Sequence, residues 1–580
     1  MKLRNLIIAG VAATMPLCGA AQEKWLHIYN VPVKTDYDKE TGEITRPKRK
    51  FVSLPWSEID SIRFKPNSKG YYLSMRVYAS DKSEYASSFP SIDHWTVGPN
   101  VPEINFTITD FPTLDDVESK EEYLDCRMTI NGRGVYDDFE SDAIRVRGRG
   151  NSTWNFPKKA YRIKLPEKTK LCGFRKAKNY VLLANYIDLS FMRNLAACLA
   201  TQYVGMPYPT HAVPVDVKFN NRYKGSYMLI EKVGVNNGSV NLSKEDEANT
   251  CMFELDTSFD EELRAPSVYF NLPVMHKDPD APEGVDPKEW FASWLDDFTE
   301  MESAVYYRKG MADQIDYTTL AKYLLCYNLA CNQELNHPKS LYLYKTKGEG
   351  QKYQFGPCWD FDWAFGYRPT YKHETGEPIS EDTAKSMIEG AKAYMEANGI
   401  EQYWMFTYNG YSLIWFGGDD FRCYNNGVFS DWPYGMKEYT PSYQNFLLGA
   451  GQNQQNTADG MGNGGEFLLS IIMDNPEFME IYRQVWEDFK QRLPEFRADF
   501  DAYVKAVEPS AERDATVWDG NYYSPYVDRE FEDREFSHAG AVEILREWIE
   551  KRIEFIDDPK MNYGLYDPAT TYVPPFKKQD

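Results

Sequence analysis

The chain has 580 residues, 42% of them hydrophobic, which is enough for two to four domains that each bury a core. Acidic residues outnumber basic residues by 87 to 65, and the formal net charge is -22. Nucleic-acid-binding proteins usually carry a basic excess or a basic stripe, so the composition argues against that class of function. The 42 tyrosines and 14 tryptophans would suit a surface that stacks on sugars, although core packing is their more common use.

Residues 1–21 have the form of a secretory signal peptide. Lys2 and Arg4 precede a short apolar run, and small residues follow this run just before residue 22. The run is too short to span a membrane, and no other segment has the uninterrupted apolar length that a spanning helix needs. Cys18 would suit lipoprotein anchoring, but Leu17 before it fits that signal poorly. We therefore predict cleavage and export to the periplasm or the extracellular space.

Nine cysteines occur in the sequence, and eight of them follow the predicted leader. None of the eight has the C-x-x-C spacing of a metal site. An exported chain can pair its cysteines, but the pairing does not follow from the sequence, and burial as small hydrophobic side chains is the alternative.

Residues 22–100 are predicted to form a small β-rich module. Apolar and polar side chains alternate over residues 51–64 and 71–79, and Pro and Ser clusters surround both segments. Residues 89–102 contain turn-forming Pro and Gly, and we predict that they form a linker.

Residues 101–370 are predicted to form an α+β core. Strands are expected over 126–134, 143–150, 160–166, 179–186, 341–345 and 353–365. Asp188 or Ser190 would cap a helix over residues 189–203, and apolar spacing predicts a further helix over residues 318–335. Asn220-Asn221 is a tight-turn signal, which predicts a β-hairpin over residues 214–233.

Residues 371–580 are predicted to form a helical C-terminal part. Helices are expected over residues 381–399, 476–494 and 541–556. The segment of residues 449–465 is rich in Gly and Asn and is predicted to be a loop.

The stretch "GPCWDFDWAFG", residues 356–366, places two aspartates among aromatic residues. In a strand Asp360 and Asp362 would share one face, and the neighbouring aromatic side chains would face the core. Two adjacent carboxylates suit Mg²⁺ or Ca²⁺, because holding both charges close together without a cation is costly. A pair of solvated strand aspartates is an equally good interpretation of this stretch alone.

The stretch "RVRGRGNSTWNFPKKAYRIKL" concentrates seven basic residues within an acidic protein. Gly148 and Gly150 permit close backbone approach, and backbone N–H groups with fixed positive charge suit a polyphosphate. An ordinary exposed basic strand is the alternative and is slightly favoured by this stretch alone. Alternation places Lys158, Arg162 and Lys164 on one face, and Lys159 on the other. The remaining three basic residues, which alternate along the preceding strand, are Arg145, Arg147 and Arg149.

Two further segments carry candidate residues. Glu231 ends an apolar strand, and it could pair with a strand lysine and orient that lysine toward phosphate. A solvated edge position is the usual role of a lone Glu. The loop "NQELNHPKS" offers possible metal-binding amides and possible bases, with turn or capping roles as the alternative for each: Asn332, Glu334, Asn336 and His337.

The order of four blocks resembles the CotH (spore coat protein H) kinase-like family. These blocks are "RGRGNSTWNFPKKAYRIKL", "YVLLANYIDLSFMRN", "YKGSYMLIEKV" and "WDFDWAFG". The resemblance covers about residues 103–370 well and extends loosely to about residue 555, whereas the N-terminal module lies outside it. The N-terminal module and the export signal together make the chain resemble exported members of this family from the Bacteroides group.

The resemblance implies an atypical protein-kinase-like core that binds ATP and Mg²⁺ and transfers a phosphoryl group to Ser or Thr of a protein substrate. It implies that Glu231 orients one of the lysines, and that Asp360 and Asp362 hold the metal, with Asn332 or Asn336 as further ligands. Asp360 is also the catalytic metal-binding residue of this scheme. The residues implied near the phosphates are Arg147, Arg149, Asn151, Lys158, Lys159, Arg162 and Lys164.

One departure from the family pattern concerns the catalytic base. Members often carry an Asp in the loop after the helix, whereas this loop contains none, so Glu334 or His337 would take that role. Phosphoryl transfer depends mainly on positioning and charge neutralisation, so the loss of one base does not abolish it. The alternative function is a non-catalytic exported binding or scaffold protein, with a protein or carbohydrate partner, on a pseudokinase-like fold. Two neighbouring aspartates cannot flank a glycosidic bond, which argues against a glycosidase.

Overall fold

The structure is a computed structural model of the chain. It describes residues 24–30, 36–37, 44–45, 51–66, 72–88, 91–108, 117, 119–150, 152–335, 338–362, 364–367, 389, 393, 404–408, 411–415, 421–425, 428–431, 443–444, 447, 464–518 and 533–565. The predicted signal peptide lies outside these residues, and the predicted helix over residues 381–399 lies outside them except for two positions. Within the described part of the chain, no helix has the length and apolar character needed to cross a membrane.

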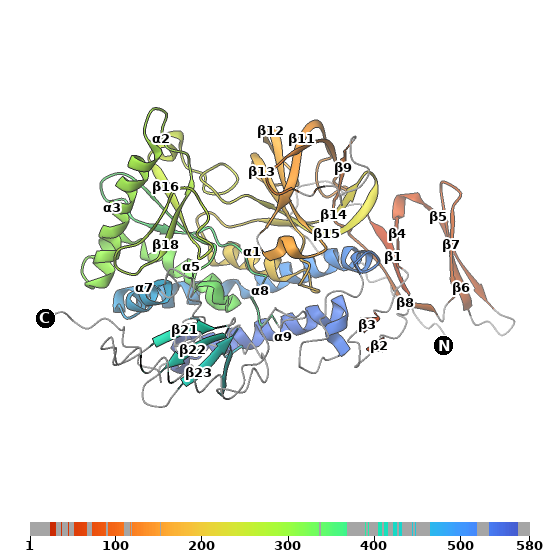
Figure 1. The fold of residues 1–580 in the computed structure, drawn as a ribbon. Coiled ribbons are helices and arrows are strands. Elements are labelled where there is room, and N and C mark those ends of the chain that lie inside the picture. The colour runs from red at the N-terminus through yellow and green to blue at the C-terminus, as the bar shows by residue number, and fades with distance from the viewer. Residues whose placement is uncertain are drawn as a thin grey trace.

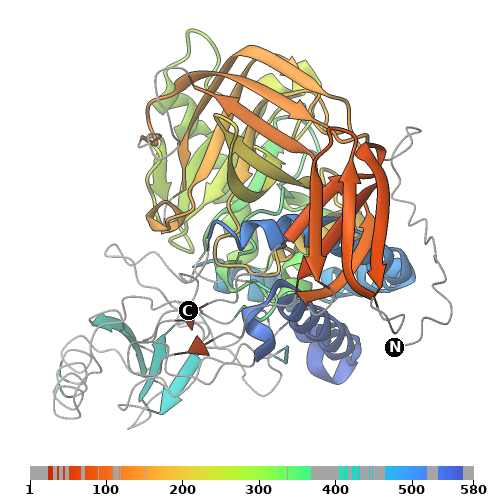
Figure 2. The ribbon, with the colours of Figure 1, turned by 90° about the vertical axis from the view of Figure 1, so that its right-hand side faces the viewer.

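The N-terminal module contains two three-stranded antiparallel sheets, of order β4-β1-β8 and β5-β6-β7. Leu26 and Ile28 of one sheet pack with Met75 and Val77 of the other. Figure 2 shows these strands side by side at one end of the molecule. The strands and the short 3-10 helix of the module are β1 (Trp25–Asn30), β2 (Asp36–Tyr37), β3 (Ile44–Thr45), β4 (Phe51–Pro55), η1 (Trp56–Glu58), β5 (Ile59–Pro66), β6 (Tyr72–Ala79), β7 (Glu84–Ser88) and β8 (Ile92–Gly98).

The predicted linker over residues 89–102 is wrong in part, because β8 occupies half of it and pairs with β1. Gly98, one of the residues that suggested a linker, is the last residue of this strand. The next strand begins at Glu103, so the module and the following domain are joined by a few residues only.

Seven strands then close into a barrel of order β10-β11-β12-β13-β15-β14-β9 (Figure 1). Ile144 and Val146 of β11 and Ile163 of β12 lie in the barrel core, whereas Arg145 and Lys164 lie outside it, as the alternation predicts. The turn at Asn220-Asn221 has positive φ at both residues and joins β14 to β15, which confirms the predicted hairpin. The elements are β9 (Glu103–Thr107), β10 (Leu124–Asn131), β11 (Phe139–Arg149), η4 (Ser152–Asn155), β12 (Ala160–Thr169), β13 (Ala177–Leu183), β14 (Ala212–Phe219) and β15 (Arg222–Glu231).

A five-stranded sheet of order β17-β18-β16-β19-β20 forms a second β-rich unit beside the barrel (Figure 1). The ring of Phe253 on β16 packs against Trp294 and Phe298 of α3. The elements are α2 (Lys244–Ala248), β16 (Thr250–Leu255), β17 (Arg264–Pro266), β18 (Pro273–Asp278), α3 (Pro287–Tyr306), α4 (Met311–Gln314), η5 (Gln333–Leu335), β19 (Leu341–Thr346) and β20 (Gln354–Phe355).

A layer of helices lies beneath both β-rich units (Figure 1). The longest is α8, whose apolar residues pack with those of α1, α5 and α9 in one large core. Helix α5 confirms most of the helix predicted over residues 318–335, and α1 begins later than predicted because Asp188 and Ser190 belong to a preceding turn. The elements are α1 (Arg193–Val204), α5 (Tyr317–Ala330), α7 (Gly464–Met473), α8 (Pro476–Asp514), η6 (Asp533–Phe536), α9 (His538–Asp557) and η7 (Pro559–Gly564).

The predicted helical C-terminal part also contains a four-stranded antiparallel sheet, which the sequence reading missed. Its strands are β21 (Trp404–Tyr408), β22 (Tyr411–Trp415), β23 (Phe421–Asn425) and β24 (Val428–Asp431). These short segments combine aromatic and β-branched residues, a composition typical of strands. The mixture of helices and strands in the described residues fits the α+β class.

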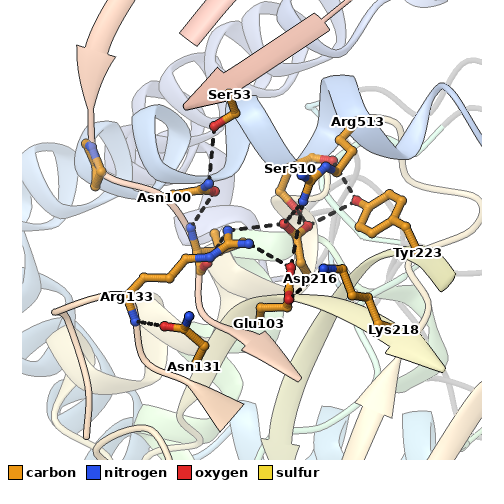
Figure 3. A network of polar contacts seen from close by, with 12 residues as sticks. Ser53, Asn100, Glu103, Asn131, Arg133, Asp216, Lys218, Tyr223, Ser510 and Arg513 are labelled. Atoms are coloured by element: carbon orange, nitrogen blue, oxygen red, sulfur yellow. Dashed lines mark hydrogen bonds and ion pairs between the residues drawn. The ribbon is translucent and has the colours of Figure 1, made fainter. Parts of the chain in front are cut away.

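A polar network joins the C-terminal end of α8 to the barrel (Figure 3). Asp216 of β14 is buried, and it accepts hydrogen bonds from Tyr223 and from Ser510 and Arg513 of α8, at 3.0, 2.6 and 3.1 Å. Arg133 also donates to Asp216, at 3.3 Å. Since a buried carboxylate is costly unless it is paired and hydrogen-bonded, this network fixes α8 against the barrel wall.

Candidate functional site

A cleft with a volume of about 260 Å³ lies between the barrel, the five-stranded sheet and the segment after β20. We call that segment, residues 356–362 and 364–367, the aspartate loop. The cleft brings together carboxylates, cations and aromatic rings from segments that are far apart in the sequence. The charged residues that line it are Arg149, Lys158, Glu254, Asp256, Asp260, Glu261, Lys277, Lys339, Asp360 and Asp362.

The aspartate loop is not the strand that its alternation predicts. The strand β20 ends at Phe355, and Asp360 has a φ of 62°, in the left-handed region that a strand never uses. Both Asp360 and Asp362 nevertheless line the cleft, and Trp359 and Phe361 are buried. The predicted separation of aspartates from aromatic side chains therefore holds only in part: Phe361 does not line the cleft, whereas Trp359 lines it together with the two aspartates, and a loop produces the arrangement. Trp363 lies outside the described residues.

Side chains from α5 and from the turn after it donate hydrogen bonds to backbone carbonyl groups of the aspartate loop. Tyr327 of α5 donates its hydroxyl to the carbonyl of Trp359, at 3.3 Å, and Asn332 donates its Nδ2 to the carbonyl of Asp360, at 2.8 Å. These bonds leave the Asp360 side chain directed at the cleft. A loop held in this way can keep a left-handed residue that would otherwise be strained.

The end of the aspartate loop packs against α9. Gly366 has a φ of 66°, and a Cβ at this position would lie 2.2 Å from Nε1 of Trp548. The amide of Phe365 donates to the carbonyl of Ala330 at the end of α5, at 2.7 Å. The glycine that follows the aspartates is thus required both by its backbone conformation and by the indole beside it.

The electrostatics of the cleft favour a cation between the aspartates. The pKa of Asp362 is raised to about 7, mainly by burial and then by the charge of the neighbouring Asp360, against the opposing effect of the Asn194 amide. Burial also raises the pKa of Asp360, and Arg149 and Lys339 oppose this shift. Carboxyl groups whose ionised form is this costly are stabilised when a positive ion enters.

The residues present fit Mg²⁺ together with a polyphosphate. Among the described residues no three His, Cys, Asp or Glu side chains form a closed metal cage. Mg²⁺ does not require one, because it is usually held by one or two carboxylates, with water and substrate phosphates as the other ligands. Arg149, Lys277 and Lys339 supply positive charge in the same cleft, which a polyphosphate needs.

Arg149 is the residue of the cationic stretch that reaches the aspartate loop. It ends β11, and its guanidinium lies 5.8 Å from the centroid of the Trp359 ring. Its neighbour on the same strand face, Arg147, instead donates to the carbonyl of Lys120 and stacks on Tyr123, at 4.9 Å.

Residues 144–408 match the family model described as CotH kinase protein. This match supports the CotH family for that part of the chain. A search of curated proteins found no match. The matched part, which we call the CotH segment, contains the residues that line the cleft. It does not contain β9, β10 or α8, so the barrel and the helical layer are completed by residues outside it.

The two lysines that directly precede β12 in the CotH segment have protein partners. Lys158 is fully buried, and its Nζ donates to Asp514 of α8 and to the carbonyl of Ser226, both at 2.6 Å. Lys159 donates to the carbonyl of Trp154, at 2.5 Å, and stacks on the same residue's ring. The expectation that both face a phosphate is therefore corrected, and only Lys158 borders the cleft.

The two outward-facing cations of β12 lie on the barrel wall. In the sheet register Arg162 pairs with Arg147, and Lys164 pairs with Arg145, which places both pairs away from the aspartate loop. Neither Arg162 nor Lys164 lines the cleft. Gly148 lies on the same strand as Arg147, and a Cβ at this position would lie 2.2 Å from the Trp154 ring. The missing side chain of Gly148 therefore makes room for Trp154 and not for a phosphate ligand.

Glu231 is not the partner of a lysine from β12. It is buried at the end of β15, and burial raises its pKa to about 8, against the opposing effect of Arg175. Nδ1 of His211 lies 3.9 Å from its carboxylate.

A lysine–glutamate pair does occur in the cleft, where Lys277 of β18 donates to Glu254 of β16, at 2.5 Å. Alternation along single strands could not reveal this pair, because the two residues meet only when β16 and β18 pair.

The loop after α5 contributes one acidic group near the aspartates. Glu334 has a pKa well above its usual range, because it is buried and Asp360 is close. Its Oε2 has no hydrogen-bond partner among the described residues. Asn332 is not placed as a metal ligand, since its side chain holds the backbone of Asp360 and of Glu334. The remaining candidates, Asn151, Asn336 and His337, lie outside the described residues.

The sequence interpretation missed six charged residues that line the cleft: Glu254, Asp256, Asp260, Glu261, Lys277 and Lys339. Asp256 accepts hydrogen bonds from the amide and the hydroxyl of Ser340, which ties the end of β16 to the start of β19. Only Lys339 belongs to a stretch that was singled out, "NQELNHPKS", where its charge beside a predicted metal site was the available signal.

Proposed function

We propose that this protein is an atypical protein kinase of the CotH type, which binds Mg²⁺ and ATP in the cleft and transfers a phosphoryl group to Ser or Thr of a protein. The observation that carries the proposal is the meeting of Asp360 and Asp362 with Arg149, Lys277 and Lys339 in one cleft. The match of the surrounding segment to the CotH kinase family supports it.

The proposal assigns a different role in phosphoryl transfer to each group of residues. Asp360 and Asp362 would hold the metal, which when bound neutralises the charge of the transferred group. Arg149 and Lys339 lie near Asp360 and would bind phosphate oxygens, and Glu254 would orient Lys277 for the same purpose. Glu334 lies near Asp360 without lining the cleft, and in its ionised form it would accept the proton of the attacking hydroxyl group.

A thermal-shift experiment tests nucleotide binding. The melting temperature of the full chain is measured with ATP and Mg²⁺, for the wild type, for Asp360→Ala and for Asp142→Ala. Asp142 is a control because it is an exposed aspartate on β11. Ligand at about 100 times its Kd stabilises a protein by about 2.7 kcal/mol, so the wild type and the control should melt at a higher temperature with ATP.

Loss of this shift in Asp360→Ala alone would support the proposed metal site, and transfer of labelled phosphate to a Ser/Thr peptide mixture then tests catalysis. A wild type without any shift would contradict the proposal. A shift without transfer would favour the second candidate function, a non-catalytic binding protein. The pairing of Lys158 with Asp514 favours that candidate, because it removes one cation of the cleft from contact with phosphate.

We also propose that the mature chain is exported, with its substrate or partner outside the cytoplasm. The predicted leader lies outside the described residues, so the support is its sequence pattern alone. Expression with the native leader, followed by N-terminal sequencing of the secreted protein, should give Gln22 as the first residue. An intact Met1 would contradict export by this route.

A further inference from the structure

The first turn of α1 contacts the aspartate loop through Arg193 and Asn194, neither of which lines the cleft. Asn194 accepts a hydrogen bond from the amide of Phe361 on its Oδ1, at 3.0 Å, and donates its Nδ2 to Oδ1 of Asp362, at 2.5 Å. The preceding residue, Arg193, donates its Nε to the carbonyl of Ala364, at 3.2 Å. Two consecutive residues of one helix thus hold the loop on both sides of its second aspartate.

The start of α1 is itself firmly anchored. Asp188 accepts hydrogen bonds from the amide of Arg193, at 2.9 Å, and from its guanidinium, at 2.5 Å. The hydroxyl and the amide of Ser190 donate to the same carboxylate, at 2.5 and 3.0 Å. Because Asp188 is fully buried and accepts all of these bonds, the turn before the helix holds the start of α1, and with it Asn194, in addition to the bonds to the aspartate loop.

The chemistry of the amide determines its orientation. The backbone N–H of Phe361 can only donate, so the oxygen of the Asn194 amide must face it. The NH₂ group then points at the carboxylate of Asp362. Asn194 is 5% exposed, so both ends of its side chain bond to the loop and away from bulk water. One oxygen of Asp362 is held from behind, and the carboxylate still borders the cleft.

We propose that Asn194 is a positioning residue for the cation site: it sets the orientation of the Asp362 carboxylate and thereby the affinity for the divalent metal. This inference rests on the proposed function. Residues that hold a metal ligand from outside typically contribute 10- to 100-fold to metal affinity. Arg193 fixes the loop beyond Asp362 but contacts neither aspartate side chain in these bonds, so its role differs from that of Asn194.

A purely structural role for Asn194 is the alternative, and the metal dependence separates the two. The experiment uses the full chain and measures the melting temperature at fixed ATP while the Mg²⁺ concentration is varied. The variants are Asn194→Ala and the milder Asn194→Ser, whose side chain is too short to bridge Phe361 and Asp362. Gln202→Ala is the control, because Gln202 lies on the same helix and is partly exposed.

We expect the Mg²⁺ concentration at half-maximal shift to rise about 10- to 100-fold in both Asn194 variants and to stay unchanged in the control. The ATP dependence of the shift in EDTA should be the same in all proteins. A lower melting temperature of the variants with an unchanged Mg²⁺ midpoint would overturn the positioning role while leaving the proposed function intact. A wild type whose shift does not depend on Mg²⁺ would overturn both.

Discussion

The aspartate loop brings both of its carboxylates to the cleft, whereas the cationic strands β11 and β12 bring only part of their charge. Residues of α1, α5 and α9 hold the loop on several sides. The strands belong to a barrel wall, and most of their cations face outward along it. The comparison teaches that a run of charge identifies a surface, while the packing around a segment decides whether its side chains enter a site.

The largest expected effect is on stability and concerns Lys158. Lys158→Ala would leave Asp514 buried without its cation, and breaking a buried pair costs about 3–5 kcal/mol. Urea denaturation should show this loss in the free energy of unfolding. Lys159→Ala is the control, because the side chain of Lys159 is partly exposed and bonds only locally. A loss below about 1 kcal/mol would show that Lys158 is available to a ligand. It would contradict the conclusion that the cationic strands bring only part of their charge to the cleft.

The second effect is on nucleotide affinity and separates two arginines of one strand. Arg149→Ala should weaken the binding of ATP with Mg²⁺ about 10- to 100-fold, since hydrogen bonds to charged groups are worth about 1.5–3 kcal/mol. Arg147→Ala should change it less than about twofold, because Arg147 bonds to residues 120–121. Isothermal titration calorimetry measures both affinities. Equal effects would show that the cationic strand acts as one surface.

The third effect is a pH dependence of the free energy of unfolding, and it comes from Glu231. Its pKa of about 8 in the folded protein lies above the unfolded value of 4.5. Between these pH values the folded state binds more protons, so the free energy of unfolding falls as the pH rises from about 4.5 through 8. Glu231→Gln should reduce this slope and stabilise the protein by about 1–2 kcal/mol at pH 9.

Urea denaturation at several pH values measures the slope, and Glu245→Gln, an exposed Glu on α2, serves as the control. The opposite outcome, a variant that is less stable than the wild type at pH 9, would mean that Glu231 is ionised and paired. That result would restore the predicted partnership with a basic residue.

The smallest expected effect belongs to Lys164. Its side chain stands on the outer wall of the barrel beside Arg145, so Lys164→Ala should change the unfolding free energy by less than about 0.5 kcal/mol. The ATP affinity should stay within about twofold of the wild-type value. A tenfold weaker affinity in calorimetry would place the phosphate site on the barrel wall and contradict the cleft.

Local sequence signals predicted much of the secondary structure correctly. Period-two alternation predicted β10–β13, the Asn220-Asn221 turn predicted the β14–β15 hairpin, and helical spacing predicted α5. Each of these signals lies within a short segment. The β8 strand was missed because Pro and Gly in its segment suggested a linker, and the sheet of β21–β24 was missed because residues 371–580 were expected to be helices with loops.

The sequence by itself also determined which residue types are available for chemistry, namely the aspartate pair and a cationic run within an acidic chain. Only the tertiary structure decided which of them meet. It closed a barrel that turns most of the cations away, paired Lys158 with a residue more than three hundred positions later, and brought Glu254 and Lys277 into the cleft. The physical reason is that alternation fixes the face of a strand, whereas the partner across that face depends on long-range packing.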